Sequence, residues 1–310
     1  MGLKHPNMGR VVFQEADFYG AASLIFGSST KPACFSATWM HGLGPVFFRK
    51  RIDPNVLIHF DEFALPIHLV NNRWTQSRLE EYGIQSKAVG MPILYADNFN
   101  LTKQRDIQRL YMPAHIIGKS RAMERIQKWS SMLNKYGCDA ICLSKTDFDF
   151  IKKRNIDLGN VKILEGAHPK NEQSLENMCS YFNSCWELIT DSSGSHIPYA
   201  TAMGVHIPIT EELCKSGEAK SNVLSTIPID LRSNFEKHMR FNPLQAVIKF
   251  WGSSDNQAKI EYSQSLLGLE CVKEKEEIKG LLAPASPVAG IKSLQSVVIK
   301  KIKRKLLSGL

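Results

Sequence analysis

The sequence of 310 residues lacks the hydrophobic segments that mark membrane and secreted proteins. It contains no run of eighteen or more apolar residues, so no segment has the length and hydropathy of a transmembrane helix. The N-terminal sequence MGLKHPNMGR has no hydrophobic region of the signal-peptide kind. From these two absences we predict a cytoplasmic protein.

Cys-x-x-Cys pairs are also absent. The seven cysteines are odd in number and scattered along the chain, which argues against a disulfide framework and favours the reduced, mostly buried thiols of a cytosolic protein. Cys138 and Cys142 are spaced to share a helix face, but no matching Cys or His pair completes a zinc site. The sequence also has no internal repeat and no low-complexity segment, so a solenoid or a largely disordered chain is not expected.

The composition predicts two folded domains and an acidic partner. A chain of 310 residues exceeds the usual single-domain size, and 43% hydrophobic residues are enough to fill two cores. The formal net charge is +9. An excess of positive charge favours nucleic acid, an anionic membrane surface or phosphate-bearing substrates, and composition does not choose among these three.

Residues 161–209 contain the pattern on which the functional interpretation depends. Three short β-branched runs, VKIL, ELIT and VHIPI, alternate with polar spans of helical character, which predicts a βαβαβ unit. In a parallel sheet of this kind, ligands bind beyond the carboxyl ends of the strands. The first two strands are each followed by a polar loop, residues 165–170 and residues 191–195, and we expect these two strands to be adjacent.

The two loops together predict a phosphate site. The second loop is expected to open a helix, so that Ser192, Ser193 and Gly194 offer backbone N–H groups at the positive end of a helix dipole. His168 would reach the same phosphate from the first loop, where Pro169 fixes the adjacent backbone. Taken singly, each feature has a simpler interpretation, because serine at a helix start is a common N-cap and His-Pro is a frequent loop dipeptide.

The motifs EGAHPK and LITDSSGSHIPYATAMGVHIPI resemble the His-Pro and Ser-Ser motifs of bacterial transferases with cytidine-activated donors. These include sialyl-, polysialyl- and Kdo transferases and, more distantly, CDP-glycerol and CDP-ribitol phosphotransferases. The resemblance implies an α/β fold of the GT-B type, with two Rossmann-like domains facing a cleft, the acceptor on the first domain and the donor on the second. It covers the second half of the chain well and the first half loosely. It implies a donor site that includes Glu165 and Pro169 beside His168 and the Ser-Ser loop.

The first half supplies candidates for the acceptor side. The strand predicted at residues 33–39 leads into a glycine-rich loop that resembles the Trp-His-Gly segment of CDP-alditol phosphotransferases and contains His41. A second predicted strand, at residues 55–60, ends in Asp61 and Glu62. Any of these three side chains is a candidate general base for an acceptor hydroxyl. The alternatives are a loop hydrogen bond for the histidine and a helix-dipole role for the acids.

The second domain is predicted to follow a polar linker at residues 97–104. Its first strand, at residues 109–112, leads into a loop and then an amphipathic helix at residues 122–136. GT-B donor domains commonly bind the donor through this loop, whose candidate residues are His115, Lys119 and Ser120. The loop ends like a Walker A motif, but Pro113 occupies the place of the required glycine, so we exclude a P-loop.

Other expected elements are strands at residues 86–89 and 140–143 and helices at residues 65–82 and 243–267. The latter would cross back to brace the first domain. Asp147 and Asp149 form an Asp-x-Asp motif, which holds a metal ion in the GT-A fold. At the start of a helix, a capping acid with a solvated neighbour is the simpler interpretation.

We expect four regions: an acceptor-side domain (residues 1–104), a donor-binding domain (residues 105–240), crossing-back helices (residues 241–290) and a basic amphipathic tail (residues 291–310). Between Val297 and Leu307 the tail interleaves five cations with apolar residues, a pattern that suits the anionic inner leaflet of a membrane. A disordered solubilising tail is the alternative. The predicted location is therefore cytoplasmic with peripheral attachment to the inner membrane.

These features predict a metal-independent glycosyltransferase of bacterial surface polysaccharide biosynthesis, acting in lipopolysaccharide or capsule synthesis. Its donor would be a cytidine-activated sugar resembling CMP-sialic acid or CMP-Kdo, its acceptor a glycan or lipid-linked glycan, and it would require no cofactor. The alternatives are a CDP-alditol phosphotransferase, a UDP- or GDP-sugar glycosyltransferase and a basic nucleic-acid-binding protein. No Arg/Lys-rich helix in the body of the chain supports the last of these, so we expect no nucleic-acid partner.

Overall fold

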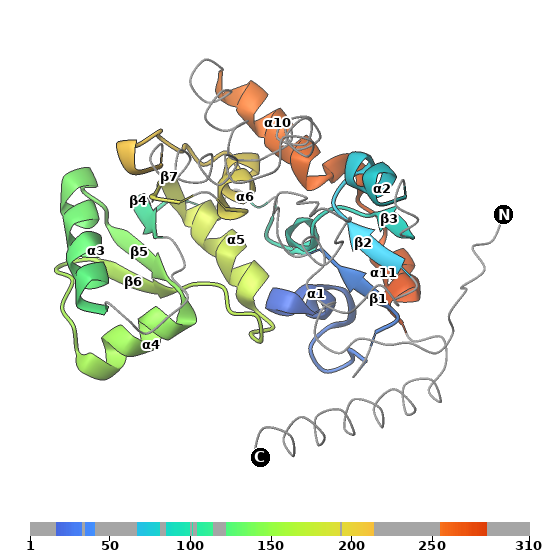
Figure 1. Cartoon of the computed structure of the whole chain (residues 1–310), viewed down its shortest axis with the longest axis horizontal. Coiled ribbons are helices and arrows are strands. Elements are labelled where there is room, and N and C mark those ends of the chain that lie inside the picture. The colour runs from blue at the N-terminus through green and yellow to red at the C-terminus, as the bar shows by residue number, and fades with distance from the viewer. Residues whose placement is uncertain are drawn as a thin grey trace, which may run out of the picture.

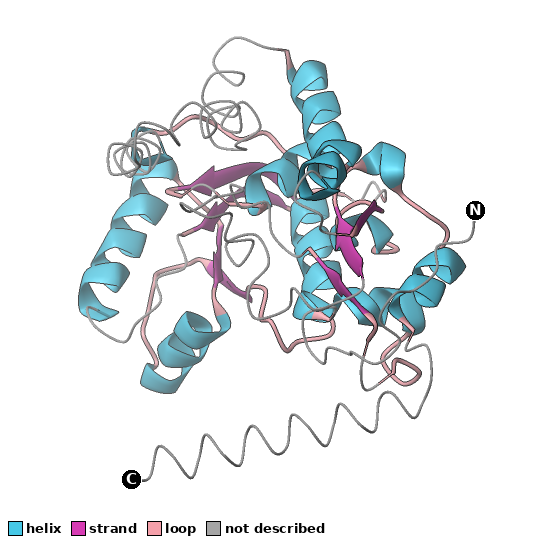
Figure 2. Ribbon diagram, turned by 45° about the vertical axis from the view of Figure 1, so that its right-hand side comes forward, coloured by secondary structure: helices cyan, strands magenta, loops and turns pink. Residues whose placement is uncertain are grey.

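The computed structural model describes residues 17–32, 35–40, 67–80, 85–99, 101, 104–113, 122–192, 194–213 and 255–283. These residues form two parallel β-sheets with helices packed around and between them (Figures 1 and 2). Within them, no helix combines the length and the apolar composition needed to cross a membrane.

The first sheet contains three parallel strands in the order β1-β2-β3, which are Ala37–Trp39, Ile67–Val70 and Ser86–Ala88. Trp39, Ile67 and Leu69 are buried in the larger hydrophobic core. That core also takes in residues of α1 (Ala21–Phe26), the 3₁₀ helix η3 (Pro92–Tyr95) and α11 (Lys275–Leu282). Helix α2 (Arg73–Glu80) packs beside β3.

The second sheet contains four parallel strands in the order β6-β5-β4-β7, which are Lys162–Glu165, Ala140–Leu143, Ile107–Met112 and Cys185–Thr190. Helices α3 (Ala122–Tyr136) and α4 (Lys145–Arg154) share a core with one face of the sheet. Helices α5 (Ser174–Ser184) and α6 (His196–Ala202) share a core with the other face (Figure 1). The predicted α/β fold with two Rossmann-like, GT-B-like parallel sheets is thus confirmed.

Local sequence explains why the helices of the second sheet begin and end where they do. On α3, Ile126, Trp129 and Leu133 recur at helical spacing and are buried against the sheet. Ser144 caps α4 by accepting the amide of Asp147, and Asn155 ends that helix in the left-handed conformation that suits a C-terminal residue.

The C-terminal helices join the two sheets. Helix α10 (Asn256–Leu267) packs along α6, and its last turn accepts a hydrogen bond of 2.7 Å from Asn71 Nδ2 to the carbonyl of Leu266. A short 3₁₀ helix, η4 (Leu269–Cys271), follows Gly268. Gly268 has φ +79°, and a Cβ there would lie 1.8 Å from the carbonyl oxygen of Asn71, so only glycine fits. The end of α10 and Gly268 thus contact the chain directly after β2 of the first sheet.

Two predicted elements were wrong. The helix expected at residues 65–82 is strand β2 followed by α2, because the apolar run IHLV enters the sheet and Asn72 then caps α2 by accepting the amide of Thr75 at 3.0 Å. The strand expected at VHIPI is reduced to one parallel bridge, between Glu187 and His206. The boundaries of the four predicted regions stay a prediction.

Candidate functional site

The carboxyl ends of β4 and β7 form the topological switch point of the second sheet. From β4 the chain progresses outward to β5 and β6, and then returns to the opposite side of β4 as β7. In open α/β sheets the loops beyond such a reversal diverge and leave a crevice for the ligand. The loop after β7 is the Ser-Ser loop, residues 191–195, so this half of the predicted phosphate site lies at the switch point.

The expectation that the His-Pro and Ser-Ser loops follow adjacent strands was wrong. Strands β6 and β7 lie at opposite edges, with β5 and β4 between them. Three strand spacings separate their ends, which is about 14 Å. The cause is the reversal of strand order, which the local pattern of residues 161–209 does not contain. All four strands are parallel, so both loops still leave the sheet at the same rim.

The chain turns back over the sheet directly after β6. The amide of Gly166 donates to the carbonyl of Leu143 at the end of β5, and a Cβ on Gly166 would lie 2.7 Å from that oxygen. Glu165 is already engaged, because its carboxylate pairs with Lys145 at 3.1 Å and its carbonyl accepts the Tyr181 hydroxyl at 3.0 Å. Glu165 therefore braces the turn, whatever its predicted role toward the donor.

His168 lies in the connection that follows. Its Nδ1 accepts the amide of Lys170 at 3.2 Å, and its backbone carbonyl accepts the Ser174 hydroxyl at 3.0 Å. Among the described residues, none forms a hydrogen bond with Nε2 of His168. The imidazole is thus held through one nitrogen by its own loop, which leaves the other nitrogen for a ligand.

The segment at residues 17–31, to which the sequence assigned no role, packs against this connection. The carbonyl of Pro169 accepts the amide of Tyr19 at 3.1 Å. Tyr19 has φ +60°, which is strained for an aromatic residue, and Gly20 follows with its Cα against the carbonyl of Glu172. Lys31 forms ion pairs with Asp17 and Glu172. A sequence pattern does not reveal the contacts with Pro169 and Glu172, because they join residues more than 140 positions apart.

The Ser-Ser loop differs from its predicted form. Helix α6 begins at His196 and its N-cap is Ser195, so Ser192 and Gly194 precede the helix and do not open it. The backbone of Ser192 is held by the Thr190 hydroxyl, which donates to its carbonyl at 3.0 Å. The same hydroxyl lies 3.0 Å from His196 Nε2. The loop is therefore anchored at its base by Thr190.

Tyr199 on α6 connects the Ser-Ser loop with the N-terminal segment. Its phenol hydrogen-bonds to Ser195, and burial raises the pKa of Tyr199, with a further contribution from the nearby phenol of Tyr19. Tyr19 also bonds to Pro169 through its amide. Tyr19 thus bonds to the His-Pro loop through its amide and lies near Tyr199, which bonds to the Ser-Ser loop. The two loops are linked in this way although β6 and β7 lie at opposite edges of the sheet.

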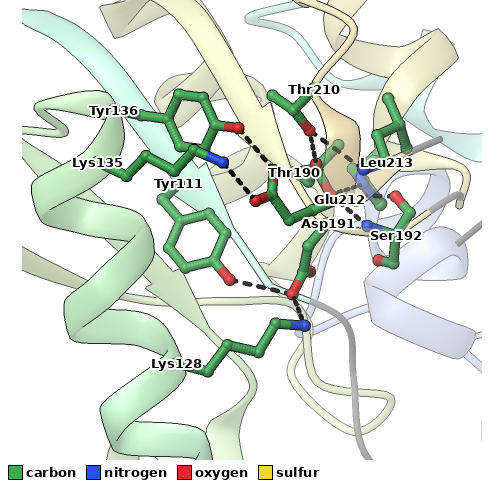
Figure 3. A network of polar contacts seen from close by, with 11 residues as sticks. Tyr111, Lys128, Lys135, Tyr136, Thr190, Asp191, Ser192, Thr210, Glu212 and Leu213 are labelled. Carbon is green, nitrogen blue, oxygen red and sulfur yellow. Dashed lines mark hydrogen bonds and ion pairs between the residues drawn. The ribbon is translucent and has the colours of Figure 1, made fainter. Parts of the chain in front are cut away.

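A polar network that the sequence did not predict surrounds the start of the Ser-Ser loop (Figure 3). The Asp191 carboxylate is almost fully buried, accepts the Tyr111 hydroxyl at 3.1 Å and pairs with Lys128 of α3. Burial and the adjacent Asp191 charge raise the pKa of Tyr111. The network fixes the end of β7 to the end of β4 and to α3.

Glu212 is a second carboxylate in this network, and like Asp191 it accepts more than one contact. It accepts Lys135 Nζ at 2.7 Å and the Tyr136 hydroxyl at 2.6 Å (Figure 3). Burial opposes its ionisation, but these hydrogen bonds outweigh burial and lower the pKa of Glu212 to about 2. The Thr210 hydroxyl donates to the Thr190 carbonyl at 3.3 Å, so the chain after α6 supports the same strand end.

The remaining predicted site residues lie outside the described part of the chain. They are His41, Asp61, Glu62, His115, Lys119, Ser120 and Ser193. Within the described part, no group of three or more His, Cys, Asp or Glu side chains is placed to hold a metal ion. Asp147 is nearly buried, accepts the Ser144 hydroxyl and pairs with Arg125 at 3.1 Å, and the N-cap of α4 is Ser144 rather than this acid.

Comparison with known proteins leaves the family open. No family model and no curated protein matches the sequence. One similar solved structure is a protein from Listeria monocytogenes assigned as a UDP-N-acetylglucosamine 2-epimerase, with 11% identity, a TM-score of 0.37 and coverage of 75% of this chain and 63% of that chain. Another is S. aureus MnaA solved with UDP, with 16% identity, a TM-score of 0.37 and coverage of 75% and 64%. The chain spans less than two thirds of either protein, and likeness at this level does not assign an activity.

Proposed function

We propose that the protein is a nucleotide-sugar-dependent glycosyltransferase that binds the donor phosphate beyond the carboxyl ends of β4 and β7. The observation that carries this proposal is the switch point, at which the order β6-β5-β4-β7 reverses beside the polar Ser-Ser loop. Open α/β sheets bind phosphorylated ligands at such a point, and the anchoring of Thr190 and Asp191 fits a loop that must hold its shape.

In the proposed reaction an acceptor hydroxyl attacks the anomeric carbon of the donor sugar, and the bond from that carbon to the phosphate oxygen breaks. Negative charge then grows on the departing nucleotide phosphate. The Ser-Ser loop amides and Nε2 of His168 would stabilise this charge without a metal ion. His41, or failing that Asp61 or Glu62, would take the proton of the acceptor hydroxyl.

The finer assignment rests on the sequence motifs. The His-Pro and Ser-Ser pair supports a cytidine-activated sugar of the CMP-sialic acid or CMP-Kdo kind as the donor. A glycan of lipopolysaccharide or capsule is then the expected acceptor. The basic segment at residues 291–310 would hold the protein at the inner leaflet, where lipid-linked acceptors are found.

Thermal-shift measurements with CMP, CDP, UDP and GDP test this proposal. We expect CMP or CDP to stabilise the protein more than UDP or GDP does, because the motifs match cytidine-dependent enzymes. The variants His168→Ala and Ser193→Ala should each reduce that stabilisation. His206→Ala is the matched control, because His206 is exposed, pairs with Glu187 and lies beside the body of β7, away from the rim.

Two results would contradict the proposal. An equal response to all four nucleotides would exclude the cytidine assignment while keeping nucleotide binding. A protein that responds to none of them would exclude the donor site itself.

A further inference from the structure

The strongest feature that the sequence motifs did not predict is the ion pair between the buried Asp191 and the half-exposed Lys128. Asp191 is the first residue after β7, and its side chain is 2% exposed. A buried carboxylate is costly unless it is paired and hydrogen-bonded, and here it accepts from Lys128 and from the Tyr111 hydroxyl. The pair therefore has a fixed position at the switch point, between the end of β7 and helix α3 (Figure 3).

The contact with Asp191 takes up only part of the hydrogen-bonding capacity of Lys128. Its side chain is 50% exposed, and among the described residues it has no other hydrogen-bond or ion-pair partner. An ammonium group carries three donor hydrogens. Lys128 thus presents its ammonium group, with unused donor hydrogens, to solvent beside the carboxyl end of β7.

Lys135 is a similar lysine at another position on α3 and therefore offers a comparison. It lies seven residues further along the helix, is 47% exposed and also pairs with one carboxylate, that of Glu212. Seven residues correspond to about 10 Å along a helix axis. Helix α3 leads from the carboxyl end of β4 toward the start of β5, so Lys128 lies nearer the ligand end of the sheet than Lys135 does.

We propose that Lys128 binds the phosphate of the nucleotide donor, and that Asp191 and Tyr111 are positioning residues that hold its ammonium beside the Ser-Ser loop. This inference rests on the proposed function, since it names a further group of the same donor site. A lysine side chain contacts phosphate as a compact point charge, which agrees with a single ammonium held by one carboxylate.

The test compares CMP and cytidine binding by titration calorimetry in wild type, Lys128→Met and Lys135→Met. We expect Lys128→Met to weaken CMP binding about tenfold to a hundredfold, the range for a lost hydrogen bond to a charged group. Cytidine lacks the phosphate, so it should bind Lys128→Met as tightly as it binds wild type. Lys135→Met should bind both ligands as wild type does, because it removes an ion pair of similar exposure on the same helix.

Lys128→Arg and Asp191→Asn complete the design. Lys128→Arg keeps the charge and should retain most of the CMP affinity. Asp191→Asn should weaken CMP binding while the ammonium is still present, because the ammonium is no longer held in place.

The outcomes separate this inference from the proposed function. If wild type binds CMP and Lys128→Met binds it equally well, or loses CMP and cytidine affinity to the same extent, the role of Lys128 is excluded and the donor site stands. If wild type binds none of CMP, CDP, UDP and GDP, the proposed function and this inference both fail.

Discussion

His68 is the residue at which burial and ionisation are in direct conflict. It lies on β2 with its side chain buried, and its Nδ1 is 2.7 Å from the Thr38 hydroxyl on β1. Burial lowers the pKa of His68 to about 4. The imidazole is therefore neutral at neutral pH, and protonating it means placing a charge in the interior of the first sheet.

We predict that this histidine makes the folded state sensitive to mild acid. Its pKa is near 6.5 in the unfolded chain and about 4 in the folded one, so the unfolded state binds the proton first. The stability that neutral His68 contributes is present above pH 6.5 and is lost as the pH falls from 6.5 to 4. From pH 7 to pH 5 the loss is about 2 kcal/mol.

Urea denaturation of wild type and His68→Gln at pH 7 and pH 5 measures this loss. Glutamine keeps a polar group beside Thr38 but does not titrate, so wild type should lose about 2 kcal/mol more than the variant. Identical pH dependence in the two proteins would show that His68 is not the titrating group.

At the residue scale, the sequence predicted the polar residues of the loops. It did not predict residues whose roles depend on contacts with distant parts of the chain. The positions of His168, Ser192 and Gly194 at the rim of the second sheet followed from the strand and loop pattern. The contacts of Lys128 with Asp191 and of Tyr19 with Pro169 join separate elements. Local periodicity contains no information about such pairs.

At the scale of elements, Arg125 joins the two helices on one face of the second sheet. It belongs to α3 and pairs at 3.1 Å with Asp147 in the first turn of α4, and the two side chains are 9% and 6% exposed. Because both charges are buried, removing the cation leaves the carboxylate of Asp147 without its partner in a dry environment.

We predict that Arg125→Met destabilises the protein by about 3 to 5 kcal/mol, the usual result of breaking a buried ion pair on one side. Lys145→Met is the control, because Lys145 pairs with Asp149 and Glu165 at the surface, where such pairs contribute about 0 to 1 kcal/mol. Urea denaturation at pH 7 measures both changes. A loss in Arg125→Met no larger than that in Lys145→Met would contradict the prediction.

Helix and strand prediction succeeded where one element has a clear period or composition. Helix α3 and strand β5 have the bounds expected from the sequence, residues 122–136 and 140–143. The order of the strands in the sheet could not be predicted from the sequence. Strands β6 and β7 are consecutive along the chain, and nothing in either sequence shows which parallel strand is its neighbour. Their separation comes from the packing of the whole sheet, which is why the adjacency prediction was wrong.

At the scale of the whole molecule, the net charge of +9 has one concentrated source in residues 291–310, which lie outside the described part of the chain. Five cations interleave with apolar residues in the segment from Val297 to Leu307. Each cation near an anionic surface contributes about 1 kcal/mol, and the apolar residues add burial in the headgroup region.

We predict that deleting residues 291–310 abolishes cosedimentation with vesicles containing phosphatidylglycerol and leaves the CMP-induced thermal shift unchanged. Vesicles of phosphatidylcholine alone are the control and should bind neither protein. If the deletion leaves vesicle binding intact and removes RNA binding, the tail is a nucleic-acid element and membrane attachment is excluded.

The larger hydrophobic core has a consequence for engineering. It contains Trp39 and Leu69 of the first sheet together with Leu110 and Leu188 of the second, so the two halves do not have separate interiors. A chimera that replaced one half with the equivalent unit of another enzyme would need matching side chains across this shared interior. The proposed donor site is therefore better altered by exchanging individual rim loops than by recombining whole modules.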